Sequence, residues 1–225
     1  GNELSFIPSR LYRLARSKAY LFRGVKITWS CDKKLLTKKD DTPEKATLHF
    51  PGGLTDYLAL TLENRNTVCE LPFSGNGKLN GGSGKVEWAI AWPEDEDEFF
   101  NSYCNTVSTS QGGTHEAGFR AAISKGIRAF ADMTGQKQAA KNINAEDIIG
   151  GACVMLSVFI SNPQFQGQTK EKLSTVEATR LVENCVRDHF EHWLSSDKKT
   201  AKGLLDYAIR RSEERRLQRQ AREVK

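Results

Sequence analysis

The chain has 225 residues, 38% hydrophobic and 27% charged, which excludes a disordered protein and allows a buried core in one large domain or two small ones. It has no run of about 18 apolar residues and no signal-peptide pattern, so neither a membrane-spanning helix nor a secretion leader is expected. Its net charge of +5 comes from residues 198–225, where ten Lys and Arg face four Asp and Glu, so residues 1–197 sum to about −1.

The number and spacing of the five cysteines indicate the redox state of the compartment. Their number is odd, their spacing is wide and no CxxC pair occurs, so neither a disulfide framework nor a zinc site is expected. We therefore expect a reducing compartment, the cytoplasm. The cysteines are Cys31, Cys69, Cys104, Cys153 and Cys185.

The beginning of the chain predicts a helix, a hairpin and a second helix. Apolar residues at helical spacing, with basic residues between them, predict a short basic amphipathic helix over Ser9–Leu21. Val25–Trp29 and Thr47–Phe50 predict two strands of a long hairpin with a charged connection. The glycines at 52 and 53 then interrupt the chain, and helical spacing resumes over Leu54–Leu62.

The next stretch predicts two strands and two loops. Val68–Phe73 is expected to be a strand, Ser74–Lys85 a flexible Gly/Asn hairpin tip, and Val86–Trp92 the clearest strand of the chain. The tip matches no phosphate-binding pattern, because Lys85 is followed by Val rather than Ser or Thr, and the third glycine of GxGxxG is missing. The acidic run Glu94–Glu98 is expected to be a solvated loop.

Helices dominate the second half. Thr114 is a candidate N-cap for a helix that ends near Gly135, and Ile148–Ile160 predicts a buried strand. Ser174–Glu177 fits a capping box that begins another helix, and a last helix begins near Leu204. Strands first and helices later, around one late strand, favour an α+β fold. The last helix has almost no apolar face beyond residue 210, which is typical of a domain connector or of a surface that meets a polyanion.

Three stretches contain residue types that are common in functional sites, and two of them remain candidates. His189 and His192 lie three residues apart on one predicted helix, without ligands from a second element, so we expect no metal site there. Thr109–Arg120 places two glycines at a tight turn into a helix. Gln164–Lys170 lies between a strand and a helix, and its Gln, Thr and Lys side chains can donate hydrogen bonds to an anionic phosphate. The residues alone make it a generic anion candidate, and a solvated loop is the commoner case.

These last two stretches, in this order and separation, resemble the ATPase subunits of bacterial type II DNA topoisomerases, which are the B subunits of DNA gyrase and of topoisomerase IV. The family pairs a Gly-Gly-Thr-His segment that opens a helix with a downstream Pro-x-Phe-x-x-Gln-Thr-Lys segment. Both are present, as Gly112–His115 and Pro163–Lys170. The family more often has Glu where Gln111 stands, so we assign that position no charge-based role, and Gly113–Glu116 favours topoisomerase IV over gyrase.

The resemblance implies the transducer domain of that ATPase subunit. Its fold is the left-handed βαβ fold of ribosomal-protein type, as in the second domain of small-subunit protein five, with a four-stranded sheet, helices and a long C-terminal helix. The transducer is expected over residues 1–197 and a basic connecting helix over 198–225, and the ATP-binding domain is expected outside this chain. Gln168, Thr169 and Lys170 would bind the γ-phosphate of ATP, with Lys170 as the catalytic residue. The full enzyme is expected to need Mg²⁺ that this chain does not bind, and the isolated chain is expected to be inactive.

The same resemblance implies partners. These are double-stranded DNA, the DNA-cleaving A subunit and a second copy of the ATPase subunit, and no membrane. We expect Arg210, Arg211, Arg215 and Arg216 to lie near DNA, because basic side chains neutralise phosphates without reading sequence.

Two other interpretations remain open. One is the middle domain of a mismatch-repair or chaperone ATPase with the same fold. The other is a non-enzymatic nucleic-acid-binding module, which is expected to carry basic and aromatic residues together on a sheet face. The strand Val86–Trp92 has two Trp among aliphatic residues and no basic residue beyond Lys85, so it is expected to belong to the core.

Overall fold

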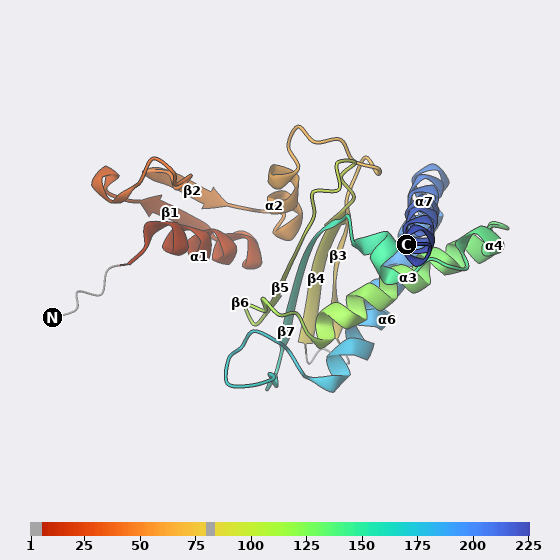
Figure 1. Ribbon diagram of the computed structural model, residues 1–225. Coiled ribbons are helices and arrows are strands. Elements are labelled where there is room, and N and C mark those ends of the chain that lie inside the picture. The colour runs from red at the N-terminus through yellow and green to blue at the C-terminus, as the bar shows by residue number, and fades with distance from the viewer. Residues whose placement is uncertain (1–5, 80–83) are drawn as a thin grey trace. The chain divides into compact units, whose positions relative to one another are not determined.

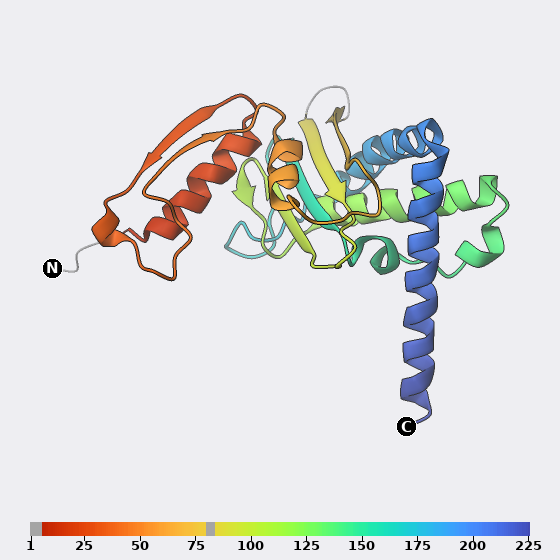
Figure 2. The ribbon, with the colours of Figure 1, turned by 90° about the horizontal axis from the view of Figure 1, so that it is seen from above.

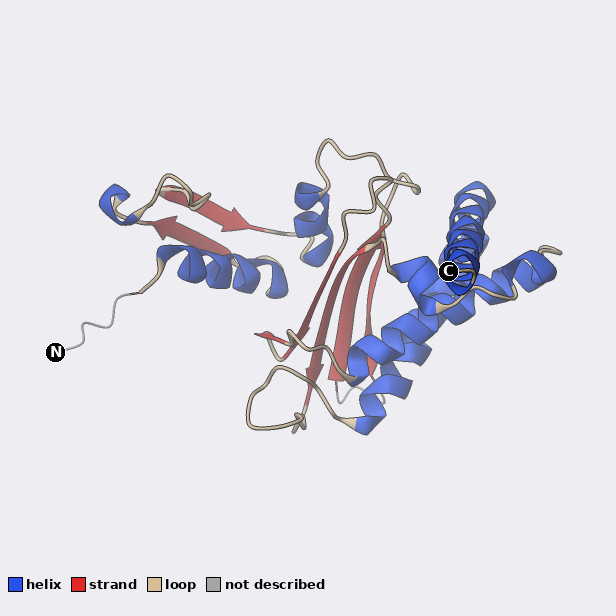
Figure 3. Ribbon diagram, in the orientation of Figure 1, coloured by secondary structure: helices blue, strands red, loops and turns tan. Residues whose placement is uncertain are grey.

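The computed structural model describes residues 6–79 and 84–225, and the chain forms two compact units, Gly1–Thr61 and Leu62–Lys225. Helices and strands occur in both units, so the predicted α+β class is confirmed (Figure 3). The sequence patterns did not predict the boundary after Thr61.

The first unit is a helix, a hairpin and a short helix, as predicted. Its elements are α1 (Pro8–Leu21), β1 (Lys26–Ser30), a 3-10 turn (Lys33–Leu35), β2 (Lys45–His49) and α2 (Leu54–Thr61). The two strands pair antiparallel. The indole of Trp29 donates a hydrogen bond to the carbonyl oxygen of Pro43 at 2.9 Å, and Tyr20 stacks on Tyr57 with ring centroids 4.3 Å apart. Aromatic contacts therefore hold this small unit together.

The second unit is built on a five-stranded mixed sheet, where four strands were expected (Figure 1). Its strands are β3 (Phe73–Leu79), β4 (Gly84–Ala91), β5 (Phe99–Cys104), β6 (Val107–Ser108) and β7 (Cys153–Ile160), in the order β3-β4-β7-β5-β6. The β5–β7 pair is parallel and the other neighbours are antiparallel. The sequence missed β5 and β6, because Phe99–Cys104 mixes apolar and polar residues without a period of two.

The predicted strand Val68–Phe73 and the predicted loop after it are wrong. The strand begins at Phe73 and runs through the glycines, while residues 80–83 of the predicted hairpin tip lie outside the described residues. A β-carbon on Gly75 would lie 2.5 Å from the ring of Trp88, which is fully buried on the neighbouring strand. This glycine thus makes room for the indole, whereas composition alone suggested a turn.

Helices cover one face of this sheet and continue beyond it (Figures 1 and 2). They are α3 (Thr114–Met133), α4 (Lys137–Ala140), α5 (Ala145–Ile149), α6 (Val176–Ser196) and α7 (Lys198–Glu223). The aromatic ring of Phe190 on α6 lies 5.0 Å from that of Phe73, so α6 packs directly on the sheet. The long C-terminal helix is confirmed as α7, and its C-terminal half projects beyond the other helices of this unit (Figure 2).

Three predicted element starts are corrected. The buried strand begins at Cys153 rather than Ile148, because Asn144 caps a short helix, α5, through a capping box with Asp147. Gly113, not Thr114, is the N-cap of α3. The capping box predicted at Ser174–Glu177 is not formed. Thr175, not Ser174, is the N-cap of α6, and its hydroxyl accepts a hydrogen bond from the backbone amide of Gln164 rather than from the helix. The local patterns predicted α3 and α6 but missed α5, which begins at a capping box of its own.

Candidate phosphate-sensing loop and its anchor

The segment between β7 and α6 is a narrow loop with two paired arms. The backbone amide of Gln166 donates to the oxygen of Lys172 at 2.9 Å, and that of Ser174 donates to the oxygen of Gln164 at 2.8 Å. Phe165 and Leu173 form the bridge between the arms. The predicted phosphate-binding residues therefore lie at the tip of a hydrogen-bonded hairpin.

The second arm of this loop also pairs with the Gly-Gly-Thr-His segment. The amide of Gln111 donates to the oxygen of Glu171 at 2.9 Å, and that of Leu173 donates to the oxygen of Gly112 at 3.0 Å. The amide of Thr114 then donates to the oxygen of Leu173 at 3.0 Å. We call these three hydrogen bonds the loop ladder. It joins the Gly-Gly-Thr-His segment to Glu171 and Leu173, which directly follow the Gln-Thr-Lys segment about fifty residues later in the sequence.

Gly113 is required by this pairing. Its φ of +134° lies in the region that side chains rarely adopt, and a β-carbon there would lie 2.2 Å from the carbonyl oxygen of Leu173. The glycine permits the close approach of two backbones at the base of the loop. The tip is consequently carried on a base of paired backbone segments.

The tip itself is open to solvent. Gln168, Thr169 and Lys170 are all exposed, and Gly167 begins the tip with a φ of +80°. The hydroxyl of Thr169 donates to the carboxylate of Glu171 at 3.3 Å. Within residues 6–79 and 84–225, the side chains of Gln168 and Lys170 have no hydrogen-bond or ion-pair partner. The tip thus offers exposed, unpaired donors.

Beneath the loop ladder lies a buried polar chain that the sequence did not reveal. The hydroxyl of Ser102 on β5 lies 2.9 Å from a carboxylate oxygen of Glu116 and 2.7 Å from the hydroxyl of Thr109. The Thr109 hydroxyl lies 2.9 Å from Nε2 of His115. Burial lowers the pKa of His115 to about 4 and raises the pKa of the Glu116 carboxyl. The only sequence signal was the Gly-Gly turn that precedes the two residues.

The four predicted DNA-facing arginines occupy two kinds of position. Arg211 lies 2.8 Å from Glu96, and Arg215 contacts both carboxylate oxygens of the buried Asp147 at 2.9 and 3.1 Å. These two fasten α7 to the rest of the unit. Arg210 and Arg216 are exposed on α7, and Arg210 lies over the ring of Tyr207.

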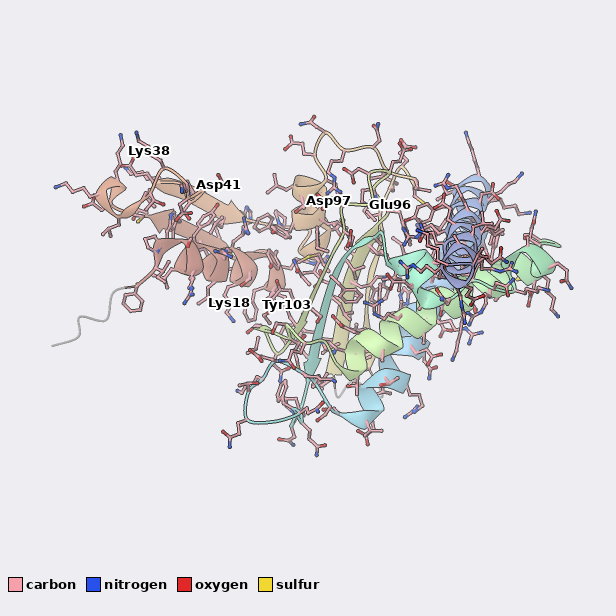
Figure 4. All side chains as sticks on the ribbon, in the orientation of Figure 1. Lys18, Lys38, Asp41, Glu96, Asp97 and Tyr103 are labelled. Atoms are coloured by element: carbon pink, nitrogen blue, oxygen red, sulfur yellow. The ribbon has the colours of Figure 1, made fainter. Side chains whose placement is uncertain are left out.

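The acidic run after β4 is an exposed loop, as predicted, and two of its side chains also have ion-pair partners. Glu96 and Asp97 lie in this loop (Figure 4), and Glu96 pairs with Arg211. Asp95 accepts two hydrogen bonds from Arg65, at 2.6 and 3.1 Å. The run thus ties residue 65 and α7 to the end of the sheet.

The two helical histidines are packing and surface residues. The Nδ1 atom of His189 lies 2.9 Å from the carbonyl oxygen of Cys185, and its ring packs edge-on against Trp88 at 5.1 Å. His192 is exposed. Among the described residues, no three His, Cys, Asp or Glu side chains come together in a group that could hold a metal ion, and no helix is long and apolar enough to cross a membrane.

Comparisons with known proteins agree on one family. The sequence model described as DNA gyrase B matches residues 53–224. The B subunit of DNA topoisomerase 4 from Caulobacter vibrioides is 51% identical over the whole chain, which covers 32% of that protein. The corresponding protein of Bartonella bacilliformis is 48% identical, again over the whole chain and 32% of its length. The chain thus spans about a third of the curated relatives it matches.

Solved structures give the same result. The topoisomerase IV ATP-binding domain of Francisella tularensis, in complex with a small-molecule inhibitor, superposes with a TM-score of 0.77 at 29% identity, over 95% of this chain and 55% of that one. The 43K ATPase domain of Thermus thermophilus gyrase B, in complex with an aminocoumarin, gives 0.78 at 26% identity, over 100% of this chain and 58% of that one. The chain therefore belongs to the family of the B subunits of DNA gyrase and topoisomerase IV.

Proposed function

We propose that this chain contains the transducer region of the B subunit of a bacterial type II topoisomerase, and that Lys170 contacts the γ-phosphate of ATP. The observation that carries the proposal is the tip of the loop, where the unpaired donors of Gln168 and Lys170 project from a base of paired backbone segments. Thr169 lies between them. An amide and an ammonium group are suited to phosphate oxygens, and a fixed cation stabilises the charge that develops during phosphoryl transfer.

The nucleotide itself would be held mainly by another part of the ATPase subunit. Gln168, Thr169 and Lys170 are all exposed at the tip, so in this proposal the loop supplies only one side of the site. The composition of the first unit suggests that another domain packs against it. A single two-stranded hairpin is marginally stable, and several large apolar side chains of this unit are exposed. These are Phe6, Ile7, Leu14, Phe22 and Leu35. We place the ATP-binding domain, and the Mg²⁺ that accompanies ATP, in the part of the ATPase subunit outside this chain.

Coupling to DNA would run through the second unit. The loop follows β7 and leads into α6, and α6 is followed directly by the long α7. The parallel strands β5 and β7 are connected through α3, α4 and α5, which supports a βαβ unit in the proposed fold. We propose that α7 approaches double-stranded DNA through the exposed Arg210 and Arg216, because Arg211 and Arg215 are occupied by carboxylates.

The complete enzyme in this proposal is an ATP-dependent isomerase. It combines two ATPase subunits with the DNA-cleaving A subunit in the cytoplasm, where the five free thiols are chemically stable. Relatives named as the B subunit of topoisomerase 4, at about half identity, favour topoisomerase IV over gyrase. The mismatch-repair and chaperone interpretations have no comparable support. The interpretation as a nucleic-acid-binding module is retained only for the surface of α7.

The decisive experiment compares two lysines of the same loop in the full-length ATPase subunit, assembled with its A subunit. We expect Lys170→Ala to lower kcat for ATP about 100-fold or more, with KM for ATP little changed, because one transition-state contact is lost while the nucleotide is held elsewhere. Lys172→Ala removes the same charge two residues away, from an exposed position next to the loop ladder, and should retain turnover. Undiminished ATP hydrolysis and DNA relaxation in Lys170→Ala would refute the proposed role.

A further inference from the structure

We propose that Ser102, Thr109, His115 and Glu116 form one directed hydrogen-bond chain that positions the Lys170 loop from beneath. They would act as positioning residues, since none of them reaches the loop tip. The inference rests on the proposed function of Lys170 only for its effect on ATP turnover. Its effect on the backbone of the loop can be measured independently.

The hydrogens of this chain can be counted. The Ser102 hydroxyl donates to a carboxylate oxygen of Glu116 at 2.9 Å, a shorter contact than the 3.3 Å to the Thr109 carbonyl oxygen. Thr109 must then supply the hydrogen for its 2.7 Å contact with Ser102, which leaves the Thr109 oxygen to accept from Nε2 of His115 at 2.9 Å. Three contacts use three hydrogens, and each donor has one acceptor.

This order also assigns the histidine tautomer. Nε2 carries the proton and Nδ1 is bare, which agrees with the absence of any partner for the buried Nδ1 among the described residues. The arrangement needs a neutral ring, and burial lowers the pKa of His115 to about 4. At neutral pH the chain therefore runs in one direction, from His115 through Thr109 and Ser102 to Glu116.

The chain connects directly to the loop ladder. The backbone amide of Thr109 donates to the oxygen of Ser102, and the amide of Gly112 donates to the oxygen of Thr109, both at 2.9 Å. A β-carbon on Gly112 would lie 2.2 Å from a carboxylate oxygen of Glu116, so the turn rests on that carboxylate. The oxygen of Gly112 then accepts from the amide of Leu173, which is a rung of the ladder.

Both ends of the loop are thus connected to the same pair of strands, β5 and β7. Ser102 lies on β5 and is paired in register with Leu156 on β7, the strand from which the loop emerges. The other end returns through the ladder to the turn that Ser102 and Thr109 hold. A loop that is fixed at both ends to one strand pair holds its tip at a defined position relative to that pair. This position matters because a displacement of about 1 Å in a catalytic group can lower the reaction rate about 100-fold.

The test uses a matched pair at Thr109 in the full-length ATPase subunit, assembled with its A subunit. Thr109→Val keeps the volume of this buried side chain but removes the hydroxyl, whereas Thr109→Ser keeps the hydroxyl. Hydrogen exchange is followed by mass spectrometry on peptides that contain the ladder amides of Gln111, Thr114 and Leu173. We expect faster exchange at these amides in Thr109→Val, together with a loss of kcat of about 10- to 100-fold at nearly constant KM for ATP. Thr109→Ser should restore both.

A stability control separates positioning from general weakening. Ile127→Val removes one methylene from the fully buried face of α3, away from the hydrogen-bond chain. It should leave hydrogen exchange at the ladder amides and kcat unchanged even if it lowers Tm. If Thr109→Val behaves like Ile127→Val, the inference is overturned. Ser102→Ala, which breaks the same chain one link further on, provides the measurement if Thr109→Val does not fold.

A double-mutant cycle links the two proposals while keeping them distinguishable. If Thr109 acts through Lys170, adding Thr109→Val to Lys170→Ala should lower kcat little further. Full additivity contradicts positioning through Lys170. A third outcome separates the proposals: hydrogen exchange at the ladder amides is faster in Thr109→Val, but ATP turnover is undiminished in Lys170→Ala. The hydrogen-bond chain would then still anchor the loop, and the function proposed for the tip would be rejected. Unchanged ladder exchange would reject the inference whatever Lys170 does.

Discussion

Gly113 and Leu173 meet backbone to backbone, in a parallel bridge that leaves no room for a side chain at residue 113. The contact joins the segment that opens α3 to the segment that opens α6, and it lies at the base of the loop that carries Lys170. Two sequence motifs about fifty residues apart are thus the two sides of one structural feature.

We predict that Gly113→Ala destabilises the chain by about 3 kcal/mol or more, because it combines a strained φ with a displaced partner backbone. Gly135→Ala is the matched control. Gly135 also has a positive φ, +77°, but a β-carbon there would meet nothing within 4 Å, so strain alone should cost about 1 kcal/mol. Urea unfolding measures both, and equal losses would contradict the role given to the Leu173 contact.

Arg215→Ala should cost about 2 kcal/mol, because it strips a buried carboxylate of its charged partner. The side chain of Asp147 is only 3% exposed, and among the described residues its carboxylate keeps one further contact, the backbone amide of Asn144. The neighbouring Arg216→Ala removes the same charge from an exposed position and should change the free energy of unfolding by less than about 0.5 kcal/mol. A similar effect of both substitutions in urea unfolding would show that Arg215 does not fasten α7.

Stability should depend on pH through His115. Its pKa is about 4 in the folded chain against an ordinary 6.5, so between these values the unfolded state binds a proton that the folded state excludes. Folding stability from this group is complete above pH 6.5 and falls as the pH drops towards 4, by about 3 kcal/mol in total.

The variant His115→Gln, which keeps a nitrogen donor, should remove this loss. Glu116 contributes with the opposite sign, because burial raises the pKa of its carboxyl and its stabilisation is lost as the pH rises through that raised value. Urea unfolding at pH 4.5 and pH 7 measures the difference, and His192→Gln, at an exposed position, serves as control. An unchanged pH dependence in His115→Gln would mean that the ring is protonated in the folded chain.

DNA binding by the full-length enzyme should depend on Arg210 and Arg216. Replacing both with Ala should weaken binding at low salt and reduce the slope of log K against log salt by about 2, since each phosphate contact contributes about 0.9. Replacing Lys33 and Lys34, two exposed lysines of the first unit, removes the same charge and should leave the slope unchanged. A filter-binding salt series distinguishes the two variants.

Several elements could be predicted because their signal is local. The stripe of apolar residues predicted α3, and the alternation from Val86 to Trp92 predicted β4. Where packing decides the choice of residue, local patterns failed. Gly75 resembles a turn residue, yet it lies in a strand because Trp88 needs the space. Arg211 and Arg215 resemble DNA-binding residues, yet they pair with Glu96 and Asp147.

The sequence by itself determined the family, the α+β class and the identity of the loop that carries Lys170, since these depend on residue types at short, recognisable spacings. Tertiary structure alone decided that this loop is anchored by Gly113 and that Ser102 belongs to its support. Hydrogen-bond partners far apart in the chain leave no periodic trace, because a ladder or a buried hydroxyl chain is selected by geometry after folding has brought the strands together. The residues of the exposed loop tip that we propose for phosphate contact could be read from the sequence, but those that anchor the loop could not.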